Sequence, residues 1–422
     1  MDNLKKNIVG WLVLVAMAAS AEFTVDKTVM GDQYWKIWND AELARINADI
    51  DKYRKSDVTI EIDAPEGAEV SVTQISTDFY FGGQTFNFNQ LGKKELNERY
   101  KALWDAETGL FNAGTVAFYW KTFEDQPGRL RFREEYWDTE EYWNEQKDPA
   151  YQMHWRRPST DQVVDYLTQR GIRIHGHPFI WGNRKWHHPD WIDAALPNNE
   201  EKEFLHKMVT ERATLQNYKD GDVFSEAYKA LSPSQLSDSL PHYAERLHEA
   251  FDQRIQRIAK HYGDRIESWD VVNESSEDWA RYRTSKTGLG YCFSGYGLMP
   301  GDYQLHALLD AKEGISPKAN LCINDYNICP DFLAQVKDLE SEGARIDVVG
   351  CQMHLFNTND CMRLAKGETN ASWVGTPKTI SDRLDMMAKT GKRLHVSEVT
   401  IAAPGLSHRD RMIQAILTRN IY

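Results

Sequence analysis

The chain has 422 residues, a length that suits one large α/β barrel or two to three ordinary domains. Aromatic residues make up 12% of it, including 14 Trp, and this number fits either a large core or a surface that binds flat, weakly polar ligands. The formal net charge of -13 argues against nucleic acid or an anionic membrane surface as a partner, because either would need a basic face.

The first 23 residues, MDNLKKNIVGWLVLVAMAASAEF, have the pattern of a secretory signal. Lys5 and Lys6 precede an apolar run, and Ala19-Ser20-Ala21 is a small-x-small cleavage site. The apolar run is short for a membrane span of about 20 residues, and no cysteine follows the cleavage site to carry a lipid. We predict cleavage after Ala21 and a secreted or periplasmic protein, with no membrane association after cleavage.

The cysteines predict neither a disulfide framework nor a metal site. Their number is odd and their spacing is not that of metal ligands, and some of them fall in apolar, strand-like runs where small buried residues are expected. The five are Cys292, Cys322, Cys329, Cys351 and Cys361.

An N-terminal extension is predicted over residues 22–77. Residues 38–54 have the apolar spacing of a helix, and VTIEIDAPEGAEVSVTQI alternates apolar and polar residues on both sides of an Ala-Pro-Glu-Gly turn. That alternation predicts a β-hairpin with one covered face. Because no Gly/Ser-rich or Pro-rich linker follows, we expect the hairpin to pack on the main domain, which we assign to residues 78–422.

The main domain repeats one unit, an amphipathic helix followed by a short apolar strand whose last residues are polar or charged. Five segments follow this pattern: DQVVDYLTQRGIRIHGHPFIWG, RIQRIAKHYGDRIESWDVVNE, LLDAKEGISPKANLCINDYN, VKDLESEGARIDVVGCQMHL and RLDMMAKTGKRLHVSEVT. A glycine stands where each helix is expected to end with positive φ, at Gly171, Gly263, Gly314, Gly343 and Gly391. With FYFGGQTFNF at 79–88 and LFNAGTVAFY at 110–119, seven strands are predicted.

The strand ends separate a closed (β/α)₈ TIM barrel from an open doubly wound sheet. An open sheet concentrates its functional groups at one switch point, whereas a barrel assembles a site from the carboxyl ends of many strands. Here nearly every strand ends in hydrogen-bonding or ionisable residues, and FGGQTFNF lacks the pattern of a phosphate-binding loop. These considerations favour the α/β barrel. The strand-end residues are His175, His177, Asn273, Glu274, Asn324, Asp325, Gln352, His354 and Glu398.

Two of these residues, Glu274 and Glu398, form the candidate catalytic pair. A run of apolar residues ends in Glu274, and burying an unpaired carboxylate in a core strand would cost several kcal/mol, so this carboxylate is expected at the mouth of the barrel. Two glutamates there suit cleavage of an acetal, because one must stay protonated to release the leaving oxygen while the other attacks as a carboxylate. Asn273 could bind a sugar hydroxyl, and His354 could keep Glu398 ionised.

The ordered motifs HGHPFIW, WDVVNE, INDYN, GCQMHL and HVSEVT resemble those of glycoside hydrolase family 10, best known for endo-β-1,4-xylanases. The resemblance implies a (β/α)₈ barrel and hydrolysis with retention, and it calls for no metal or cofactor. It implies that Glu274 is the acid/base, that Glu398 is the nucleophile and that Asn273 binds the 2-hydroxyl of the reacting sugar. It also implies further contacts with substrate from His177, Trp181, Gln352 and His354 around that sugar, and from Tyr326 on the leaving-group side. The hairpin is similar to an extension that some members carry.

Three departures from the family pattern stand out. Ala117 and Phe118 replace a Glu-Asn pair that holds the distal sugars, although the accompanying Lys121 remains as a substrate-binding residue. Thr400 stands where the family usually has Asp, two residues after the nucleophile. After the seventh strand, SHRDRMIQAILTRNIY predicts a helix and no eighth strand follows, so we expect a chain truncated before that strand.

Other features have two interpretations or a structural one. In HGHPFIWGNRKWHH, we expect His175 and His177 to project from alternate faces of a strand, with no carboxylate to complete a zinc site. The charged insertion over residues 194–240 predicts a helical excursion that covers or shapes the barrel mouth. The segment 131–157 holds three Trp and three Tyr, which suit either a sugar platform or packing of an insertion.

The sequence therefore predicts a monomeric retaining endo-β-1,4-glycanase whose substrate is xylan. The alternatives are a family member that acts on a different or decorated β-glycan and a carbohydrate-binding protein without turnover.

Overall fold

The computed structural model describes residues 25–422 apart from residues 62, 64, 66, 73–76, 150–156, 185, 209–229, 286–290 and 294–297. The predicted signal peptide and its cleavage site lie outside the described residues. Among the helices that are described, none has the length and apolar character that crossing a bilayer requires.

The described chain divides into two compact units. The larger unit, Val58–His354 with Lys378–Thr400, contains most of the parallel sheet. The smaller unit joins the N-terminal residues up to Asp57 with Leu355–Pro377 and Ile401–Tyr422. Each unit is therefore made of segments that are far apart in the sequence.

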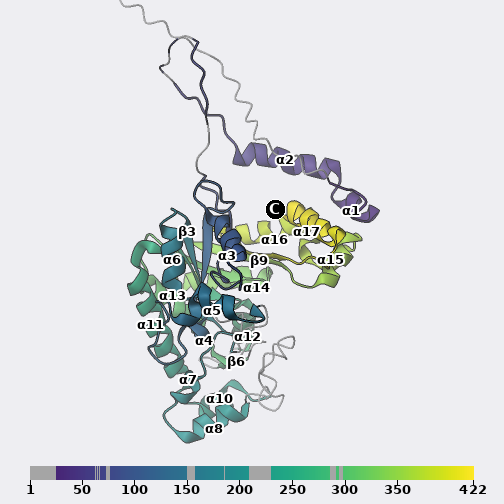
Figure 1. The fold of residues 1–422 in the computed structure, drawn as a ribbon. Helices are drawn as coiled ribbons and strands as arrows, with labels where there is room; N and C mark the ends of the chain where they lie inside the picture. Colours follow the sequence, from purple (N-terminus) through teal and green to yellow (C-terminus); the bar gives the residue numbers. More distant parts are fainter. Residues whose placement is uncertain are drawn as a thin grey trace, which may run out of the picture. The chain divides into compact units, whose positions relative to one another are not determined.

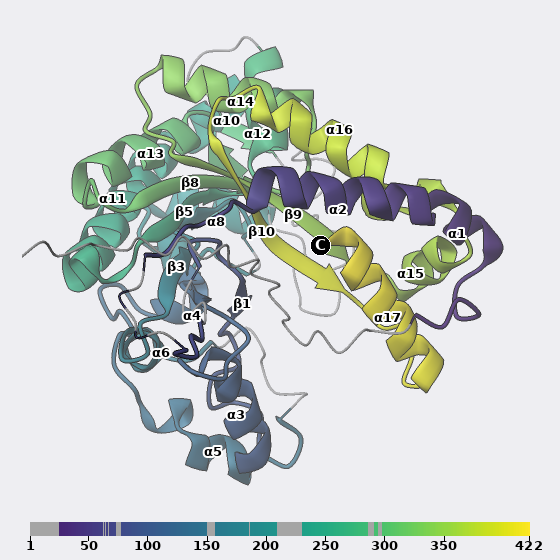
Figure 2. The same ribbon diagram turned by 90° about the horizontal axis from the view of Figure 1, so that it is seen from above.

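The main sheet has the strand order β1-β2-β3-β5-β8-β9-β10, and the two-residue strand β4 pairs with β5. Figure 1 shows two of these strands, β3 and β9, among the helices. The paired strands whose registers are known run parallel, and in Figure 2 β3, β5, β8 and β9 lie side by side. The strands are β1 (Gly82–Gln84), β2 (Ala113–Ala117), β3 (Arg173–His177), β4 (Ile180–Trp181), β5 (Ser268–Asn273), β8 (Asn320–Asp325), β9 (Val348–Leu355) and β10 (Arg393–Ile401). Since the strands of this path follow one another in chain order and helices connect them, the predicted (β/α)₈ class is confirmed.

All seven predicted strands are present, and β1 and β10 stand at the two ends of the described path. Helices of the larger unit lie between the strands in sequence. They are α3 (Lys94–Lys101), α4 (Trp120–Phe123), α5 (Glu140–Glu145), α6 (Thr160–Thr168), α7 (Trp191–Ala194), α8 (Asn199–Met208), α10 (Pro233–Ser239), α11 (Tyr243–Tyr262), α12 (Ser276–Ser285), α13 (Tyr303–Gly314) and α14 (Pro330–Ser341). The helix α16 (Pro377–Ala388) follows in the chain and leads to β10.

Strand β5 lies in the buried interior of the sheet. All six of its residues are buried, as expected for a parallel strand that is covered on both faces. Trp269 stacks on Phe179 with ring centroids 4.3 Å apart. A Cβ atom at Gly176, on the neighbouring strand β3, would lie 2.2 Å from the Trp269 ring, so only glycine fits there.

The helix ends follow the glycine pattern with one exception. Gly171, Gly263, Gly343 and Gly391 have positive φ, as predicted. Gly314 is instead the last residue of α13, and Ile315 caps that helix.

The helix predicted over residues 38–54 is present in the smaller unit as α2 (Asp40–Arg54), and a shorter helix, α1 (Asp32–Ile37), precedes it. Asn39 separates them, and its side chain accepts a hydrogen bond from the Glu42 backbone N–H, which is the pattern of an N-cap. The unit also contains α15 (Thr358–Ala365) and α17 (His408–Ile421). The apolar spacing thus predicts α2 but not the separate short helix α1.

The predicted hairpin is only partly seen. Its turn is present, because the Ala68 N–H donates to the Pro65 carbonyl at 3.1 Å. The described residues on either side of the turn form no strand, and the apolar side chains among them, including Val58, Ile60 and Val72, are exposed. The expectation of a covered face is therefore wrong for these residues, since alternation alone does not supply a surface that covers them.

Two insertions interrupt the chain between strands of the main sheet. The excursion over residues 194–240 forms helices α8 and α10 at its two ends, and residues 209–229 between them are outside the described part. The strands β6 (Tyr291–Phe293) and β7 (Leu298–Pro300) form a separate antiparallel pair that the sequence analysis does not predict. Among the described cysteines, Cys322, Cys329, Cys351 and Cys361 are free thiols.

Candidate active site

The two candidate catalytic carboxylates are held by the same amide group. Gln352 on β9 donates from Nε2 to Glu274 Oε1 at 3.1 Å and to Glu398 Oε1 at 2.9 Å. Two oxygens that accept hydrogen bonds from the same nitrogen at these distances lie no more than about 6 Å apart, which is the sum of the two distances. Glu274 directly follows β5 and Glu398 lies on β10, so the sheet brings together two residues that are distant in the sequence.

Glu398 is surrounded by hydrogen-bond donors. Its Oε1 accepts from Asn324 Nδ2 at 2.7 Å as well as from Gln352, and its Oε2 lies 3.4 Å from His354 Nε2. His177 Nε2 is 3.9 Å from Oε1. Burial opposes ionisation, but the charge of His177 and the hydrogen bond from His354 together hold the pKa of Glu398 below its ordinary value. Glu398 is therefore a carboxylate at neutral pH.

Glu274 has an unusual backbone conformation, with φ of 53°. A residue other than glycine in this left-handed region stores strain of roughly 1–3 kcal/mol and persists only where its surroundings hold it. The Glu274 N–H donates to the Asn324 carbonyl at 2.7 Å, which continues the pairing of β5 with β8 beyond the strand end. The strand thus ends in a turn at Glu274.

His354 takes a defined tautomer because of its neighbours. The amide nitrogen of Gln352 is already a donor to the carboxylates, so its Oε1 is an acceptor. The single Nε2–H of His354 is shared between this oxygen, at 3.1 Å, and Glu398 Oε2, at 3.4 Å. On the other side, His354 Nδ1 meets the Thr400 hydroxyl at 3.1 Å. Thr400 therefore keeps a hydrogen bond to His354 but supplies no charge.

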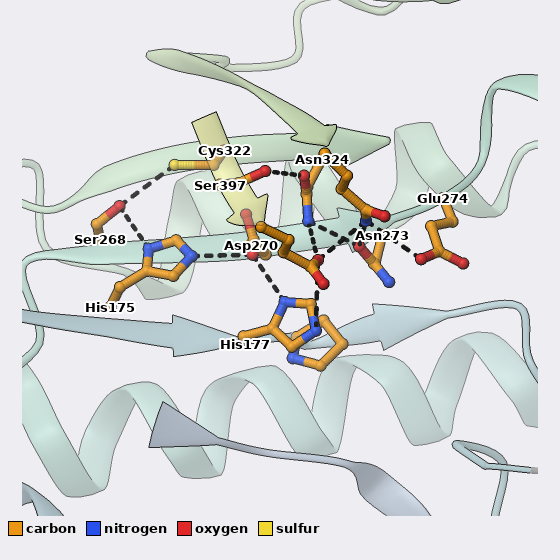
Figure 3. A network of polar contacts seen from close by, with 12 residues as sticks. His175, His177, Ser268, Asp270, Asn273, Glu274, Cys322, Asn324 and Ser397 are labelled. Atoms are coloured by element: carbon orange, nitrogen blue, oxygen red, sulfur yellow. Dashed lines mark hydrogen bonds and ion pairs between the residues drawn. The ribbon is translucent and has the colours of Figure 1, made fainter. Parts of the chain in front are cut away.

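A buried network extends from His177 into the barrel interior, as Figure 3 shows. Asp270 Oδ2 lies 2.8 Å from both His177 Nδ1 and His175 Nε2. His175 Nδ1 in turn is 2.9 Å from Ser268 Oγ, which contacts Cys322 Sγ at 3.3 Å. Burial alone would raise the pKa of Asp270, but the two histidines hold it well below its ordinary value. Burial would lower the pKa of His177, yet the charges of Glu398 and Asp270 raise it above its ordinary value.

This network corrects one expectation. His175 and His177 do not lie on alternate faces of β3, because residues two apart in a strand share a face, and both bind the same oxygen of Asp270. The two histidines together with Asp270 resemble the start of a ligand set. Nevertheless, the described residues contain no group of three or more His, Cys, Asp or Glu side chains with the arrangement of a metal site.

The sequence analysis missed the roles of Asp270 and Asn324. Asp270 stands inside the apolar strand SWDVVN, where the cost of burying a carboxylate already drew attention to Glu274. The same argument would have found Asp270. A register shift between Asp270 and Val272 lets both Asp270 and Asn273 reach the interior, and strict alternation could not predict that bulge.

The remaining predicted residues differ in their relation to the carboxylates. Asn273 Oδ1 accepts from Asn324 Nδ2 at 2.9 Å and from Gln352 Nε2 at 3.2 Å, so Asn273 belongs to the network. Trp181 is paired with Asn273 in the sheet. Tyr326 follows β8 two residues after Asn324 and is 40% exposed.

Lys121 is placed differently. Its Nζ forms an ion pair with Asp190 at 2.9 Å, and both side chains are partly exposed. The ion pair of Lys121 in the described structure is thus with a loop aspartate and not with Glu274 or Glu398.

The substituted pair at the end of β2 is apolar and buried. Ala117 pairs with His177 and packs in a cluster with Tyr119, Trp181 and Trp186. Phe118 is fully buried, with its ring 5.0 Å from that of Trp269. Phe118 is therefore part of the core and adds no apolar surface in place of the Glu-Asn pair.

The sequence is similar to a family model and to several characterised proteins. The model of glycosyl hydrolase family 10 matches residues 139–420. Endo-1,4-beta-xylanase B of Thermotoga neapolitana is 33% identical over 201 residues, which are 46% of this chain and 42% of that protein. Endo-1,4-beta-xylanase A of Halalkalibacterium halodurans is 27% identical over 206 residues, 48% of this chain and 42% of that one. The matched region spans less than half the length of these curated relatives.

Among solved structures, xylanase B from Clostridium stercorarium F9 matches with a TM-score of 0.48 and 17% identity, covering 81% of each chain. The family model covers more than half of the sequence and includes β3, β5 and β8–β10 with both glutamates. The chain belongs to glycosyl hydrolase family 10.

Proposed function

We propose that this chain is a retaining glycoside hydrolase that cleaves within β-1,4-linked xylan. The observation that carries the proposal is the shared hydrogen bonding of Glu274 and Glu398 to Gln352 Nε2, at 3.1 and 2.9 Å. A retaining enzyme needs carboxyl groups about 5–5.5 Å apart, whereas an inverting enzyme needs about 6.5–9.5 Å to admit a water molecule. The upper limit of about 6 Å between the two bonded oxygens favours retention.

The surroundings of each carboxylate support the proposal for the two roles. Glu398, with donors from Asn324, Gln352 and His354 and a lowered pKa, is the nucleophile that attacks the anomeric carbon as a carboxylate. Glu274 is the acid that protonates the departing glycosidic oxygen.

In the second half of the reaction, the same residues act in reverse. Once Glu398 is esterified by the sugar, its negative charge is gone, and Glu274 has lost a repulsive neighbour. Glu274 then accepts a proton from water while the water oxygen attacks the anomeric carbon, and Glu398 leaves as a carboxylate. Asn273 is proposed to bind the 2-hydroxyl, with His177, Trp181, Gln352 and His354 around the same sugar.

Xylan is the proposed polymer because the relatives named above are xylanases. Another relative is named exoglucanase XynX, from Acetivibrio thermocellus, and is 27% identical over 208 residues, 48% of this chain and 15% of that protein. Because of this name and the apolar replacement at Ala117, other β-glycans are to be tested as substrates beside xylan. Lys121 and Tyr326 are proposed as outer substrate contacts, and we propose a secreted or periplasmic monomer.

The test is release of reducing ends by the chain from Glu22 onward, acting on β-1,4-xylan, β-glucans and mannans. Glu274→Gln and Glu398→Gln are expected to lower kcat by at least about 10³-fold, because each removes a group that takes part in bond cleavage. Glu267→Gln is the matched control, since Glu267 lies at the opposite end of the same strand and is exposed. Full activity in either amide variant, or binding of xylan without release of reducing ends by the parent, would contradict the proposal.

A further inference from the structure

Asn324, the fifth residue of β8, contacts both candidate catalytic residues. Its side-chain amide donates to Glu398 Oε1 at 2.7 Å and to Asn273 Oδ1 at 2.9 Å. Its backbone carbonyl accepts the Glu274 N–H at 2.7 Å. The residue is completely buried, and Figure 3 shows it beside Ser397 and Asn273.

The orientation of the Asn324 amide is fixed by its partners. The carboxylate of Glu398 can only accept a hydrogen bond when ionised, so the group facing it must be the NH₂ of Asn324. The Ser397 hydroxyl donates to Asn324 Oδ1 on the other side. An amide with both ends bonded cannot rotate without breaking one of these contacts, so Asn324 presents a fixed donor to Glu398.

The neighbouring strand leaves room for this arrangement. Gly350 on β9 faces the Asn324–Ser397 contact, and a Cβ atom there would lie 2.7 Å from Asn324 Oδ1 and 3.0 Å from Ser397 Oγ. The φ of Gly350 is not in the left-handed region, so its backbone does not require glycine. The absence of a side chain at Gly350 therefore leaves room for the contact between Asn324 and Ser397.

The backbone of Asn324 has a second task. Glu274 is held in a left-handed conformation, which needs an external constraint to persist. The hydrogen bond from the Glu274 N–H to the Asn324 carbonyl is such a constraint, and it joins the strained residue to the same position that holds Glu398. One residue thus links the two carboxylates through its side chain and its main chain.

We propose that Asn324 is a positioning residue that sets both the ionisation of Glu398 and its placement relative to Glu274. The inference rests on the proposed function for the naming of nucleophile and acid. The contacts themselves also predict an effect on the titration of Glu398 that can be measured without any substrate.

The main test is Asn324→Asp, which replaces the NH₂ donor by an oxygen next to Glu398. Two carboxyl groups at hydrogen-bonding distance cannot both be ionised easily, so the pKa of Glu398 should rise, by at least about one pH unit. Titration of ¹³C-labelled glutamate carboxyl groups by NMR measures this directly, with Glu398→Gln used to assign the signal. Labelling only glutamate keeps the introduced aspartate out of the spectrum.

Asn320→Asp is the matched control. Asn320 begins the same strand at its far end, and its Oδ1 accepts a hydrogen bond from Arg393, which an aspartate can also accept. This variant should leave the titration of Glu398 and the kinetics unchanged. Circular dichroism and thermal unfolding of all variants check that each is folded.

Kinetics on the active parent provide the second measurement. Loss of the donor should lower kcat by about 10- to 100-fold in Asn324→Asp and Asn324→Ala with little change in KM, and should move the acidic limb of the rate profile of Asn324→Asp to higher pH. Gly350→Ala, which displaces the amide without removing it, should lower kcat in the same direction by a smaller factor. It also serves if the Asn324 variants fail to fold.

The outcomes are distinguishable. If the parent hydrolyses no β-glycan, the proposed function fails, while the NMR titration still decides whether Asn324 controls Glu398. If Glu398 titrates in Asn324→Asp as it does in the parent, or if Gly350→Ala and Asn324→Ala keep parental kcat, the positioning role is overturned.

Discussion

Two histidines face the carboxylate of Glu398, and the groups behind them differ. His177 is backed by the buried carboxylate of Asp270 at 2.8 Å, which helps to raise the pKa of His177. His354 is backed by the hydroxyl of Thr400 at 3.1 Å, where the family pattern has an acid. A carboxylate behind one imidazole and a neutral group behind the other make the two sides of Glu398 electrostatically unequal.

At this scale we predict the effect of His354→Leu on the pH profile. Burial raises the pKa of Glu398, and both histidines act against it, so removal of His354 should raise the pKa. Because the proposed nucleophile Glu398 must be ionised to attack, activity is expected to be lost as the pH falls through this pKa. The acidic limb of kcat/KM should therefore move to higher pH, by about one unit.

The measurement is kcat/KM from about pH 3 to pH 8 on an aryl β-xyloside with a good leaving group, a range that spans the ordinary values of Glu and His. His206→Leu is the control, because His206 is exposed on α8. An acidic limb that stays where the parent has it would show that His354 does not act on the ionisation of Glu398.

At the scale of an element, helix α11 holds two loops of the sheet through one buried cation. Arg254 Nε donates to the Phe179 carbonyl at 2.9 Å, and its Nη2 donates to the Phe118 carbonyl. The guanidinium lies over the ring of Trp120 at 5.2 Å. Burial lowers the pKa of Arg254 to about 9, a value that still leaves it charged at neutral pH.

We predict that Arg254→Leu destabilises the protein by about 2–4 kcal/mol, because the buried carbonyls of Phe118 and Phe179 each lose a hydrogen bond from the guanidinium. Arg254→Lys should lose less, since it keeps the charge but cannot reach several carbonyls with one planar group. Urea unfolding measures both, and Arg257→Leu, on the exposed side of the same helix, is the control. If the Leu and control variants unfold at the same urea concentration, the helix is not held in this way.

At the scale of the whole molecule, the sequence predicts the class of fold and the meeting of Glu274 and Glu398. The seven strands are predicted from apolar runs with polar ends. This local pattern is reliable here because parallel strands are covered on both faces and are therefore apolar throughout. Glu274 and Glu398 follow from the motifs around them. Their meeting at Gln352 is consistent with the barrel topology.

Other features depend on contacts that no local pattern contains. The bulge in β5, the shared use of Asp270 by two histidines and the central place of Asn324 arise where different strands meet. In the predicted hairpin, the local pattern is present but the predicted packing is not. Residues 58–72 have an alternating pattern, but their described apolar side chains are exposed, because a pattern does not specify what covers it.

The last prediction concerns the smaller unit, in which N-terminal residues pack with segments more than 300 positions away. Trp38 is buried and donates from Nε1 to the Gly375 carbonyl at 3.3 Å. Its neighbour Tyr34 stacks on it at 6.4 Å and accepts a hydrogen bond from Asn420 Nδ2 at 2.8 Å. The Gly31 N–H donates to the Ala365 carbonyl at 2.7 Å, so α1 is bound to both α15 and α17.

Trp38→Ala should therefore cost about 3–5 kcal/mol and loosen helices that lie far from it in the sequence. Hydrogen exchange should show faster exchange in peptides covering α15 and α17, while peptides covering β5 and β8 serve as the internal reference. Trp35→Ala is the control, because Trp35 is only partly buried and bonds to the nearby Lys27 carbonyl. Unchanged protection of α15 and α17 in Trp38→Ala would mean that the N-terminal residues lie on this unit without stabilising it.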